Sequence, residues 1–401
     1  MGDMHAADVG AANVSQPASD PAHASGIGPR IVAIARSFDE GTSRVRVLKK
    51  GRRVAQVLGV RGHPRFTDAG APSGVPAEDL EVLCEQLTGA PIRSVVHRHL
   101  SGWKESGAFL LRMTSVRGST ANLICKVNDH RPRAIAALEG FPVAVGPSEP
   151  LVLQAGSDGL RSFLPELYFI RTGEGLPTVL YLEALGARWH TCTALPVDIV
   201  RAARAAARLQ GQLDRWHMTD TPTDLIAYDR DFAERLNAYL LTRLSDYASS
   251  SGDVAADGIV RRWGAISQLY LHDARGDHVR PTVVHGDFNT ANVFIGAPRR
   301  HVKVIDWEWA GVGDGYRDLA ALLKRSSKRT ESRALEAYHS VAGGVPAPFR
   351  YERLQIERGL LDAAFLSVQL SQTEYEPRMN LRMYIDSSLR RVLRAEGVLT
   401  A

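Results

Sequence analysis

The sequence predicts an α+β fold in two parts, a small antiparallel β lobe followed by a larger and mostly helical lobe. Between residues 92 and 185, short apolar runs are separated by glycine-containing turns, a pattern typical of strands. From Pro196 onward, apolar residues recur at helical spacing. With 401 residues, 44% of them apolar, the chain is long enough to build a core in both parts.

The N-terminal region differs from the rest of the sequence in composition. Residues 1–29 are rich in Ala, Ser, Pro, Gly and Asp with few large apolar side chains, which predicts a disordered tail. Residues 31–60 alternate apolar and polar positions between glycines, which predicts a small antiparallel meander. A solvated strand face explains the Arg and Lys residues of this meander, and a binding patch is the alternative. A Gly- and Pro-rich linker follows at residues 61–77.

The first lobe is placed at residues 30–185, with the meander as an extra element. A helix is predicted at residues 77–87, because Leu80, Leu83 and Leu87 share one face and Gly89 follows them. A short helical segment is predicted at residues 150–154. The predicted strands lie at residues 92–100, 107–115, 120–128, 166–170 and 178–185.

Two features of this lobe suit an anionic ligand. The loop after the first of these strands contains two glycines, the second being Gly107, and glycines let backbone N–H groups approach phosphate oxygens. Ser106 in the same loop could donate a hydrogen bond to a phosphate. Lys126 lies inside an apolar strand, where its amine must find an anion or extend to solvent. Glu139 and Glu149 are the two carboxylates that could hold this lysine.

The second part, residues 186–401, contains a series of helical patterns. A break at residues 249–253, rich in Ser and Gly, separates the second pattern from the third. The predicted helices lie at residues 199–217, 231–247, 259–272, 319–324, 332–338, 352–373 and 377–396.

One stretch, residues 282–295, concentrates polar groups between two apolar runs. Val283 and Val284 lead into a tight polar loop that contains Asp287 and Asn292, and an apolar run resumes at residue 293. A further apolar run is followed by Asp306. These three polar side chains are therefore expected on adjacent loops at strand ends, where side chains project into a crevice. Two carboxylates and an amide oxygen suit Mg²⁺, which prefers oxygen ligands.

This pattern resembles the aminoglycoside phosphotransferase and choline kinase family, whose fold is like that of protein kinases. The resemblance rests on His285-Gly286-Asp287, on Asn292 five residues later, on Ile305-Asp306-Trp307-Glu308, and on the segment from Gly313 to Ala320. It is strong between about residues 282 and 323 and weaker between residues 100 and 185. It implies a bilobal protein-kinase-like fold with a nucleotide-binding N-terminal lobe and a catalytic C-terminal lobe.

For the nucleotide, the resemblance implies that Lys126 binds the phosphates of ATP. Glu149 is favoured over Glu139 as its partner, because a helix followed by a strand is the order that the family shows after its glutamate. Residues 128–148 would then be an insertion. Residues 182–185, which include Glu183 and Leu185, would form the hinge whose backbone groups bind adenine.

For catalysis, the resemblance implies that Asp287 accepts a hydrogen bond from the acceptor hydroxyl and orients it, while Asn292 and Asp306 hold Mg²⁺. His285 and Asp318 are expected to brace the catalytic loop. The predicted function is an ATP-dependent O-phosphotransferase acting on a hydroxyl of a small molecule. An aminoglycoside-like antibiotic or an amino sugar is the favoured acceptor.

Several alternatives remain for the function. Choline-like, sugar and amino-acid acceptors are open, and so is a nucleotide-binding protein without turnover. The gap between Asp306 and Asp318 is too short for a long regulated activation loop, which argues against a protein kinase. Acidic residues near the C-terminus could meet a cationic acceptor, but arginines are interspersed with them, so solvated helix faces explain them better. The acids are Glu357, Asp362, Glu374, Glu376 and Asp386, and the arginines are Arg358, Arg378, Arg382 and Arg390.

Composition restricts the partners and the compartment. The net charge is +5, but the basic residues are spread along the whole sequence, which favours a phosphate-rich ligand such as ATP over nucleic acid. Cys84, Cys125 and Cys192 are widely spaced in apolar segments, which predicts buried thiols in a reducing cytoplasm with no disulfide and no zinc site. No apolar run is long enough to span a bilayer, and no secretory signal is recognised. A monomer and a homodimer are both compatible with the sequence.

Overall fold

The computed structural model describes most of the protein from residue 68 onward. The described residues belong to one compact unit that extends from Arg44 to Ala401. The predicted tail, the predicted meander, Ser106, Glu139 and most of the predicted glycine loop lie outside them. The described ranges are 68–100, 107–128, 140–142, 148–154, 158–173, 177–219, 225–271, 281–296, 301–343, 346–372 and 377–400.

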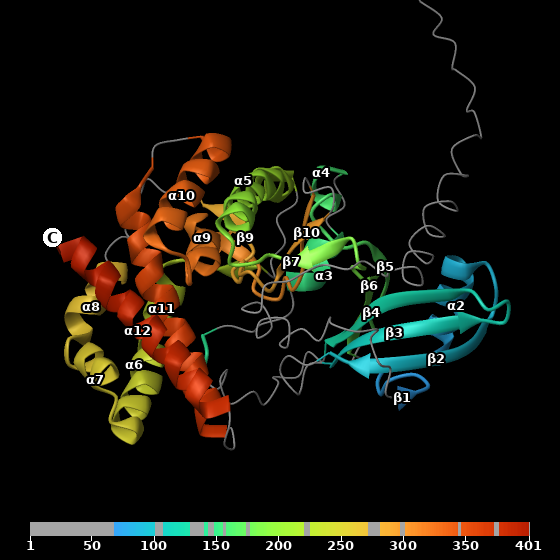
Figure 1. Cartoon of the computed structure of the whole chain (residues 1–401), viewed down its shortest axis with the longest axis horizontal. Coiled ribbons are helices and arrows are strands. Elements are labelled where there is room, and N and C mark those ends of the chain that lie inside the picture. The colour runs from blue at the N-terminus through green and yellow to red at the C-terminus, as the bar shows by residue number, and fades with distance from the viewer. Residues whose placement is uncertain are drawn as a thin grey trace, which may run out of the picture. The chain divides into compact units, whose positions relative to one another are not determined.

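The first part of the fold is an antiparallel sheet with the strand order β1-β2-β3-β4-β6-β5 (Figure 1). The α+β class and the predicted strands are confirmed, and β3 and β4 begin and end at the predicted residues. The strands are β1 (Asp68–Ala69), β2 (Ile92–His99), β3 (Gly107–Ser115), β4 (Thr120–Asn128), β5 (Leu167–Arg171) and β6 (Thr178–Glu183).

One face of this sheet is covered by helix α2 (Ala77–Thr88), which packs against β2, β3 and β4. Leu80 and Leu83 of α2 are buried against alternate residues of the strands, among them Leu111 and Leu123, which pair across β3 and β4. The helix ends at Gly89, whose φ of 72° is left-handed. Because side chains alternate along a strand, Lys126 projects to the face opposite Leu123.

Two short helices lie between β4 and β5 in the sequence. They are α3 (Ser148–Gln154) and α4 (Asp158–Arg161). The helical segment predicted at residues 150–154 is therefore confirmed, and it begins two residues earlier. This start places Glu149 in the first turn of α3, where it is buried.

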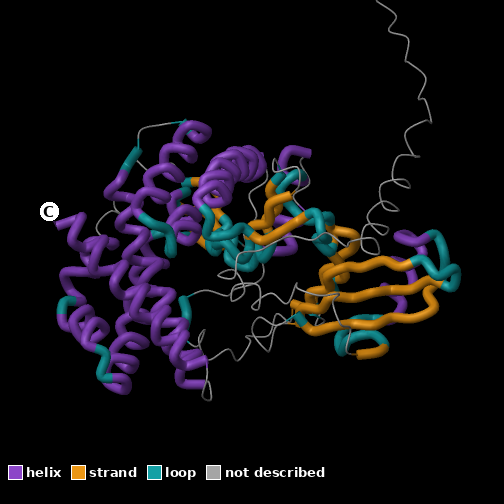
Figure 2. The backbone as a smooth tube through the Cα atoms, viewed as in Figure 1, coloured by secondary structure: helices purple, strands orange, loops and turns teal. Residues whose placement is uncertain are grey.

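The second part of the fold is mostly helical (Figure 2). Long helices pair along their length: α5 packs against α10, and α11 packs against α12. The single helix predicted at residues 259–272 is wrong, because the backbone turns at Arg262 and forms two helices there. The helices are α5 (Pro196–Thr219), α6 (Arg230–Ser251), α7 (Val254–Arg261), α8 (Trp263–Leu271), α9 (Tyr316–Leu323), α10 (Lys328–Ala342), α11 (Pro348–Gln372) and α12 (Pro377–Thr400).

The break predicted at residues 249–253 is confirmed. Gly252 ends α6 with a left-handed φ of 66°, and the carboxylate of Asp253 then accepts the first free N–H groups of α7. The apolar faces of α6, α7, α8, α11 and α12 form one buried cluster. A second cluster joins α5, α9 and α10 to the short strands described next.

Two small sheets lie among these helices and carry the polar loops. One has the order β11-β10-β7, and the other has the order β8-β12-β9. Strands β7, β8 and β12 were not predicted, because two or three residues are too few to show a period. The strands are β7 (Trp189–Thr191), β8 (Ile226–Ala227), β9 (Thr282–Val284), β10 (Val293–Gly296), β11 (Val302–Val304) and β12 (Gly311–Gly313).

The three cysteines and the hydropathy of the helices bear on two of the expectations from composition. Cys84, Cys125 and Cys192 are buried and free, as predicted. Burial raises the pKa of the Cys125 and Cys192 thiols to about 12. Within the described part of the protein, no helix is both long and apolar enough to cross a membrane.

Candidate active site

The polar loop directly follows the buried strand β9. Val283 and Val284 are fully buried, and β9 packs against α5. The buried ring of His285 follows. Its Nε2 lies 2.9 Å from the carbonyl oxygen of Ile305, and its Nδ1 lies 3.2 Å from the backbone nitrogen of Asp287. The ring thus ties the start of the loop to the segment that carries Asp306.

The carboxylate of Asp318, on α9, accepts hydrogen bonds from the backbone of the same loop. One carboxylate oxygen accepts a hydrogen bond from the backbone N–H of Gly286 at 3.0 Å. The other accepts from the backbone N–H of His285 at 3.2 Å and from Nε2 of Gln210 at 3.0 Å. Burial raises the pKa of Asp318, and these donors oppose that rise. The bracing expected of His285 and Asp318 is present.

Gly286 is required by both its conformation and its surroundings. Its φ is 79°, a left-handed value that side chains rarely adopt. A Cβ atom at this position would overlap the carbonyl oxygen of Trp309 and the hydroxyl of Tyr228. The loop can therefore approach the next segment closely only with glycine at this position.

The two carboxylate oxygens of Asp287 have different partners. Oδ2 accepts hydrogen bonds from Nδ2 of Asn289 at 2.8 Å and from Nδ2 of Asn292 at 3.1 Å. Oδ1 accepts one from Nη2 of Arg358 at 2.7 Å. These hydrogen bonds hold the carboxylate in one orientation. The Asp287 side chain is 21% exposed, so solvent still reaches it.

The hairpin of β10 and β11 brings Asn292 and Asp306 together. Val293 pairs with Val304, and the backbone N–H of Ile305 donates to the carbonyl oxygen of Asn292 at 3.0 Å. Asn292 uses its amide nitrogen toward Asp287. Its amide oxygen has no hydrogen-bond partner among the residues that the structure describes. Asp306 has a φ of 70°, the one left-handed value at a described residue other than glycine.

Lys126 of β4 contacts two carboxylates, those of the favoured partner Glu149 and of Asp306, which was not predicted as a partner of the lysine. Its Nζ lies 2.7 Å from Oε1 of Glu149 and 2.8 Å from Oδ1 of Asp306. Burial lowers the pKa of Lys126, but the nearby carboxylates outweigh burial and raise it above its ordinary value. Lys126 is therefore a half-buried, charged ammonium between two acidic groups of the site.

Glu149 is itself fixed to the segment after Asp306. Its Oε1 accepts a hydrogen bond from the backbone N–H of Trp307 at 3.4 Å, and the hydroxyl of Ser148 donates to the carbonyl oxygen of Trp307 at 2.9 Å. The start of α3 and the end of the β10–β11 hairpin thus form one unit around Lys126. Glu139, the other candidate partner, lies outside the described residues.

The oxygen groups of Asn292 and Asp306 suit a metal ion that arrives with a phosphate ligand. Mg²⁺ keeps several waters and is usually bound by one or two carboxylates plus substrate phosphates. Among the described residues, no cluster of three or more His, Cys, Asp or Glu side chains forms a closed metal cage. One carboxylate beside one free amide oxygen fits Mg²⁺ shared with a nucleotide, and it does not fit a structural metal.

Three other residues were predicted to bind the nucleotide and are described by the structure: Glu183, Leu185 and Gly107. The Glu183 carboxylate, at the end of β6, lies 2.6 Å from Nζ of Lys303 and accepts from the backbone N–H of Glu166 at 3.2 Å. The backbone N–H of Glu183 is also in use, because it donates to the carbonyl oxygen of Glu166 at 2.8 Å. Leu185, the other predicted hinge residue, is half-buried. Gly107 opens β3, where a Cβ atom would contact Val127 closely.

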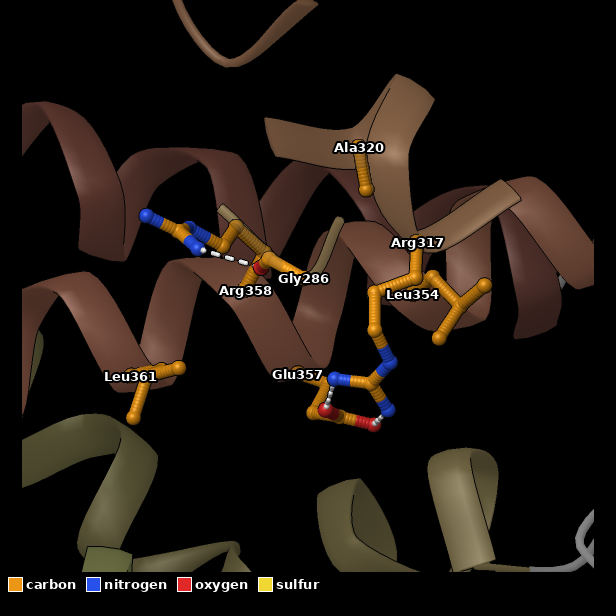
Figure 3. A pocket seen from close by; sticks show the side chains of 7 residues that line it. All are labelled: Gly286, Arg317, Ala320, Leu354, Glu357, Arg358 and Leu361. Carbon is orange, nitrogen blue, oxygen red and sulfur yellow. Dashed lines mark hydrogen bonds and ion pairs between the residues drawn. The ribbon is translucent and has the colours of Figure 1, made fainter. Parts of the chain in front are cut away.

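Arg358 was not predicted as a site residue. The interpretation of α11 as a solvated face is wrong at Arg358 and its neighbours, because Glu357 is buried against Arg317, and Asp362 is paired with Arg358 and Lys324. Glu357 and Arg358 line a small cavity together with Gly286 of the catalytic loop (Figure 3).

The interpretation as a solvated helix face is confirmed for Asp386 and Arg390 on α12, which form an exposed ion pair. Glu374 and Glu376 lie outside the described residues. The spacing of Arg358 and Asp362, four residues apart, was the available signal in the sequence for a pair on one helix face.

An antiparallel sheet whose lysine pairs with a glutamate of α3, joined to a helical part with an Asp–Asn–Asp constellation, defines a phosphotransferase with a protein-kinase-like fold. Residues 159–355 match the model of the phosphotransferase enzyme family (APH). The class of enzyme is that of a small-molecule kinase. This family segment contains Asp287, Asn292, Asp306 and Asp318, whereas Lys126 and Arg358 lie outside it.

Solved structures with the same fold are distant in sequence. A spectinomycin phosphotransferase, APH(9)-Ia, in complex with ADP and spectinomycin is 13% identical, with a TM-score of 0.52, covering 80% of this protein and 99% of that one. The choline kinase LicA from Streptococcus pneumoniae is also 13% identical, with a TM-score of 0.50, covering 80% of this protein and 98% of that one. No curated protein sequence matches this one.

Proposed function

We propose that this protein is an ATP-dependent, Mg²⁺-requiring O-phosphotransferase that acts on a hydroxyl group of a small molecule. The observation that carries the proposal is the pairing of Lys126 with both Glu149 and Asp306 beside the oriented carboxylate of Asp287. A half-buried ammonium next to a carboxylate that can bind a metal ion suits the phosphates of a nucleotide. The adjacent, partly exposed aspartate suits the hydroxyl that attacks them.

Each residue has a part in the transfer that its contacts support. Asp287 accepts a hydrogen bond from the acceptor hydroxyl and takes its proton as the hydroxyl oxygen bonds to the γ-phosphorus and the bond to the ADP oxygen breaks. Lys126, held by Glu149, binds phosphate oxygens. Asn292 and Asp306 would hold Mg²⁺, which supplies neutralisation of phosphate charge. Most of the catalysis is then positioning and charge stabilisation.

For the acceptor, we propose an alcohol on a small molecule, with an aminoglycoside-like antibiotic or an amino sugar as the first class to test. One fold neighbour is a spectinomycin phosphotransferase and another is a choline kinase, so both classes of acceptor belong in the test. Glu357 and Asp362 already pair with basic residues of the protein. A polycationic acceptor would therefore have to use other carboxylates.

A transfer assay with a panel of hydroxyl compounds tests this function. The protein is incubated with ATP labelled in the γ-phosphate, Mg²⁺ and aminoglycosides, amino sugars, choline-like alcohols, sugars or hydroxy amino acids. The expected result is a phosphorylated product from at least one class, lost when Mg²⁺ is chelated. Tight Mg²⁺-dependent ATP binding without transfer to any acceptor would instead support a nucleotide-binding protein without turnover.

A further inference from the structure

Arg358 is an arginine of α11 that reaches the candidate catalytic loop from outside the family segment. Its Nη2 donates to Oδ1 of Asp287 at 2.7 Å. Figure 3 shows its second contact with the loop, in which Nη1 lies 3.4 Å from the carbonyl oxygen of Gly286. Its side chain is 15% exposed. The guanidinium thus contacts the loop at two successive residues, one through the carboxylate and one through the backbone.

The division of partners on Asp287 gives Arg358 a particular place. Oδ2 is occupied by the amides of Asn289 and Asn292, so Oδ1 is the oxygen left to meet an acceptor hydroxyl. Two partners of one oxygen, each at hydrogen-bond length, lie less than about 6 Å apart. The guanidinium is therefore a close neighbour of any hydroxyl that Asp287 orients.

Arg358 is itself fixed by two further charged groups. Its Nε lies 3.0 Å from Oδ1 of Asp362, one helical turn further along α11. Asp362 in turn lies 3.2 Å from Nζ of Lys324, at the end of α9. The result is a series of alternating charges, Asp287–Arg358–Asp362–Lys324, in which each inner member has two partners. Such a series restricts the rotamers of Arg358 and so fixes the guanidinium beside Asp287.

We propose that Arg358 is a positioning residue for phosphoryl transfer, which holds the Asp287 carboxylate in one orientation through Oδ1, with Asp362 as the group that orients Arg358. The inference rests on the proposed function, since it assigns a part in that reaction. Arg358 then supports the transfer step more than the binding of either substrate. Lysine is a poor replacement, because a point charge cannot hold the Asp287 carboxylate and the Gly286 carbonyl oxygen in one fork.

A second arginine of α11 provides a matched control. Arg353 is also mostly buried and pairs with the carboxylate of Asp314 at 3.4 Å, and it donates to the carbonyl oxygen of Tyr270. Replacing it removes a buried arginine from the same helix and leaves the contacts to Asp287 and Gly286 in place. A general effect on the packing of α11 would appear in both Arg358→Ala and Arg353→Ala.

The test compares steady-state kinetics of full-length wild type, Arg358→Ala, Arg358→Lys, Asp362→Asn and Arg353→Ala with the acceptor found in the panel. For Arg358→Ala we expect kcat to fall about ten- to a hundredfold, with the KM for ATP and for the acceptor within about threefold of wild type. Arg358→Lys is expected to stay below wild type, and Asp362→Asn to show a smaller loss of kcat. Arg353→Ala should keep its kcat within about threefold.

Chemical rescue separates positioning from folding. Added guanidinium ion at millimolar concentration should restore part of the kcat of Arg358→Ala, because the ion can take the vacated place beside Oδ1. It should not raise the activity of wild type or Arg353→Ala. A wild-type kcat in Arg358→Ala, or a loss of kcat that is equal in Arg353→Ala and is not rescued, would overturn the inference.

Failure of the proposed function and failure of the role of Arg358 give different results. If wild type itself transfers phosphate to no acceptor, the proposed function fails and this inference fails with it. If wild type transfers phosphate and the Arg358 variants do so equally well, the function stands and only the role of Arg358 is lost.

Discussion

The contact between Asp318 and the catalytic loop makes a quantitative prediction for Asp318→Asn. Asp318 is 1% exposed, and each of its carboxylate oxygens accepts a hydrogen bond from a backbone N–H of the loop. An asparagine amide has one oxygen, so in either orientation its NH₂ group faces a backbone N–H. At least one hydrogen bond to a charged acceptor is lost, and a buried donor is left without a partner.

A hydrogen bond to a charged group contributes about 1.5–3 kcal/mol, and a buried donor left unpaired costs about 1–3 kcal/mol; the two figures describe the same loss and are not added. We therefore expect Asp318→Asn to lower the unfolding free energy of the helical part by about 2–3 kcal/mol. The measurement is urea unfolding followed by tryptophan fluorescence, with the midpoint shifted and the slope retained. The kcat should fall as well, because the loop loses its anchor.

The control for this prediction is Asp386→Asn, which removes the charge from an exposed helix pair with Arg390. It should leave the urea midpoint unchanged. If Asp318→Asn shows the wild-type midpoint and the wild-type kcat, the account of Asp318 as the support of the catalytic loop is refuted.

Three further predictions test other parts of the site. Asp306→Ala should lose Mg²⁺-dependent ATP binding together with turnover in calorimetric titrations at several Mg²⁺ concentrations, and an unchanged Mg²⁺ dependence would contradict its assignment as a ligand. Gly286→Ala should be strongly destabilised in thermal unfolding, because its Cβ meets backbone atoms, whereas Gly118→Ala, with a similar φ of 80° but open space, should lose only about 1–2 kcal/mol. Burial raises the pKa of Asp362, but Arg358 and Lys324 lower it by more than burial raises it, so its pKa lies below the ordinary value. Its ionised form therefore stabilises the fold above about pH 4, and acidification below that should cost wild type more stability than Asp362→Asn.

The regular elements could be predicted where the sequence shows a period over several residues. Strands β3 and β4 have alternating apolar positions and glycine-containing turns, so their limits were found to the residue. Strands β8 and β12 are two and three residues long and form through pairing with each other and with β9, which local sequence does not encode. The division between α7 and α8 was missed because an apolar face continues across Arg262.

The candidate site could be predicted where its parts are close in sequence. Asp287 and Asn292 lie on one loop, and Asp306 follows one hairpin later, so their spacing alone placed them together. Glu149 was preferred through the resemblance and through the order of helix and strand. Arg358 is 71 residues from Asp287 and sits among alternating charges, a pattern that also describes an exposed helix. Only the packing of α11 against α9 shows that these charges are inside.

The most direct test of the central claim is a paired measurement on Asp287→Asn: calorimetric binding of Mg²⁺-ATP, and phosphate transfer to the acceptor found in the panel. Because Asp287 is assigned to the acceptor hydroxyl and Lys126, Asn292 and Asp306 to the nucleotide, we expect ATP affinity within about threefold of wild type and kcat reduced about a thousandfold or more. Transfer at the wild-type rate, or ATP affinity lost in parallel with kcat, would contradict this division of roles.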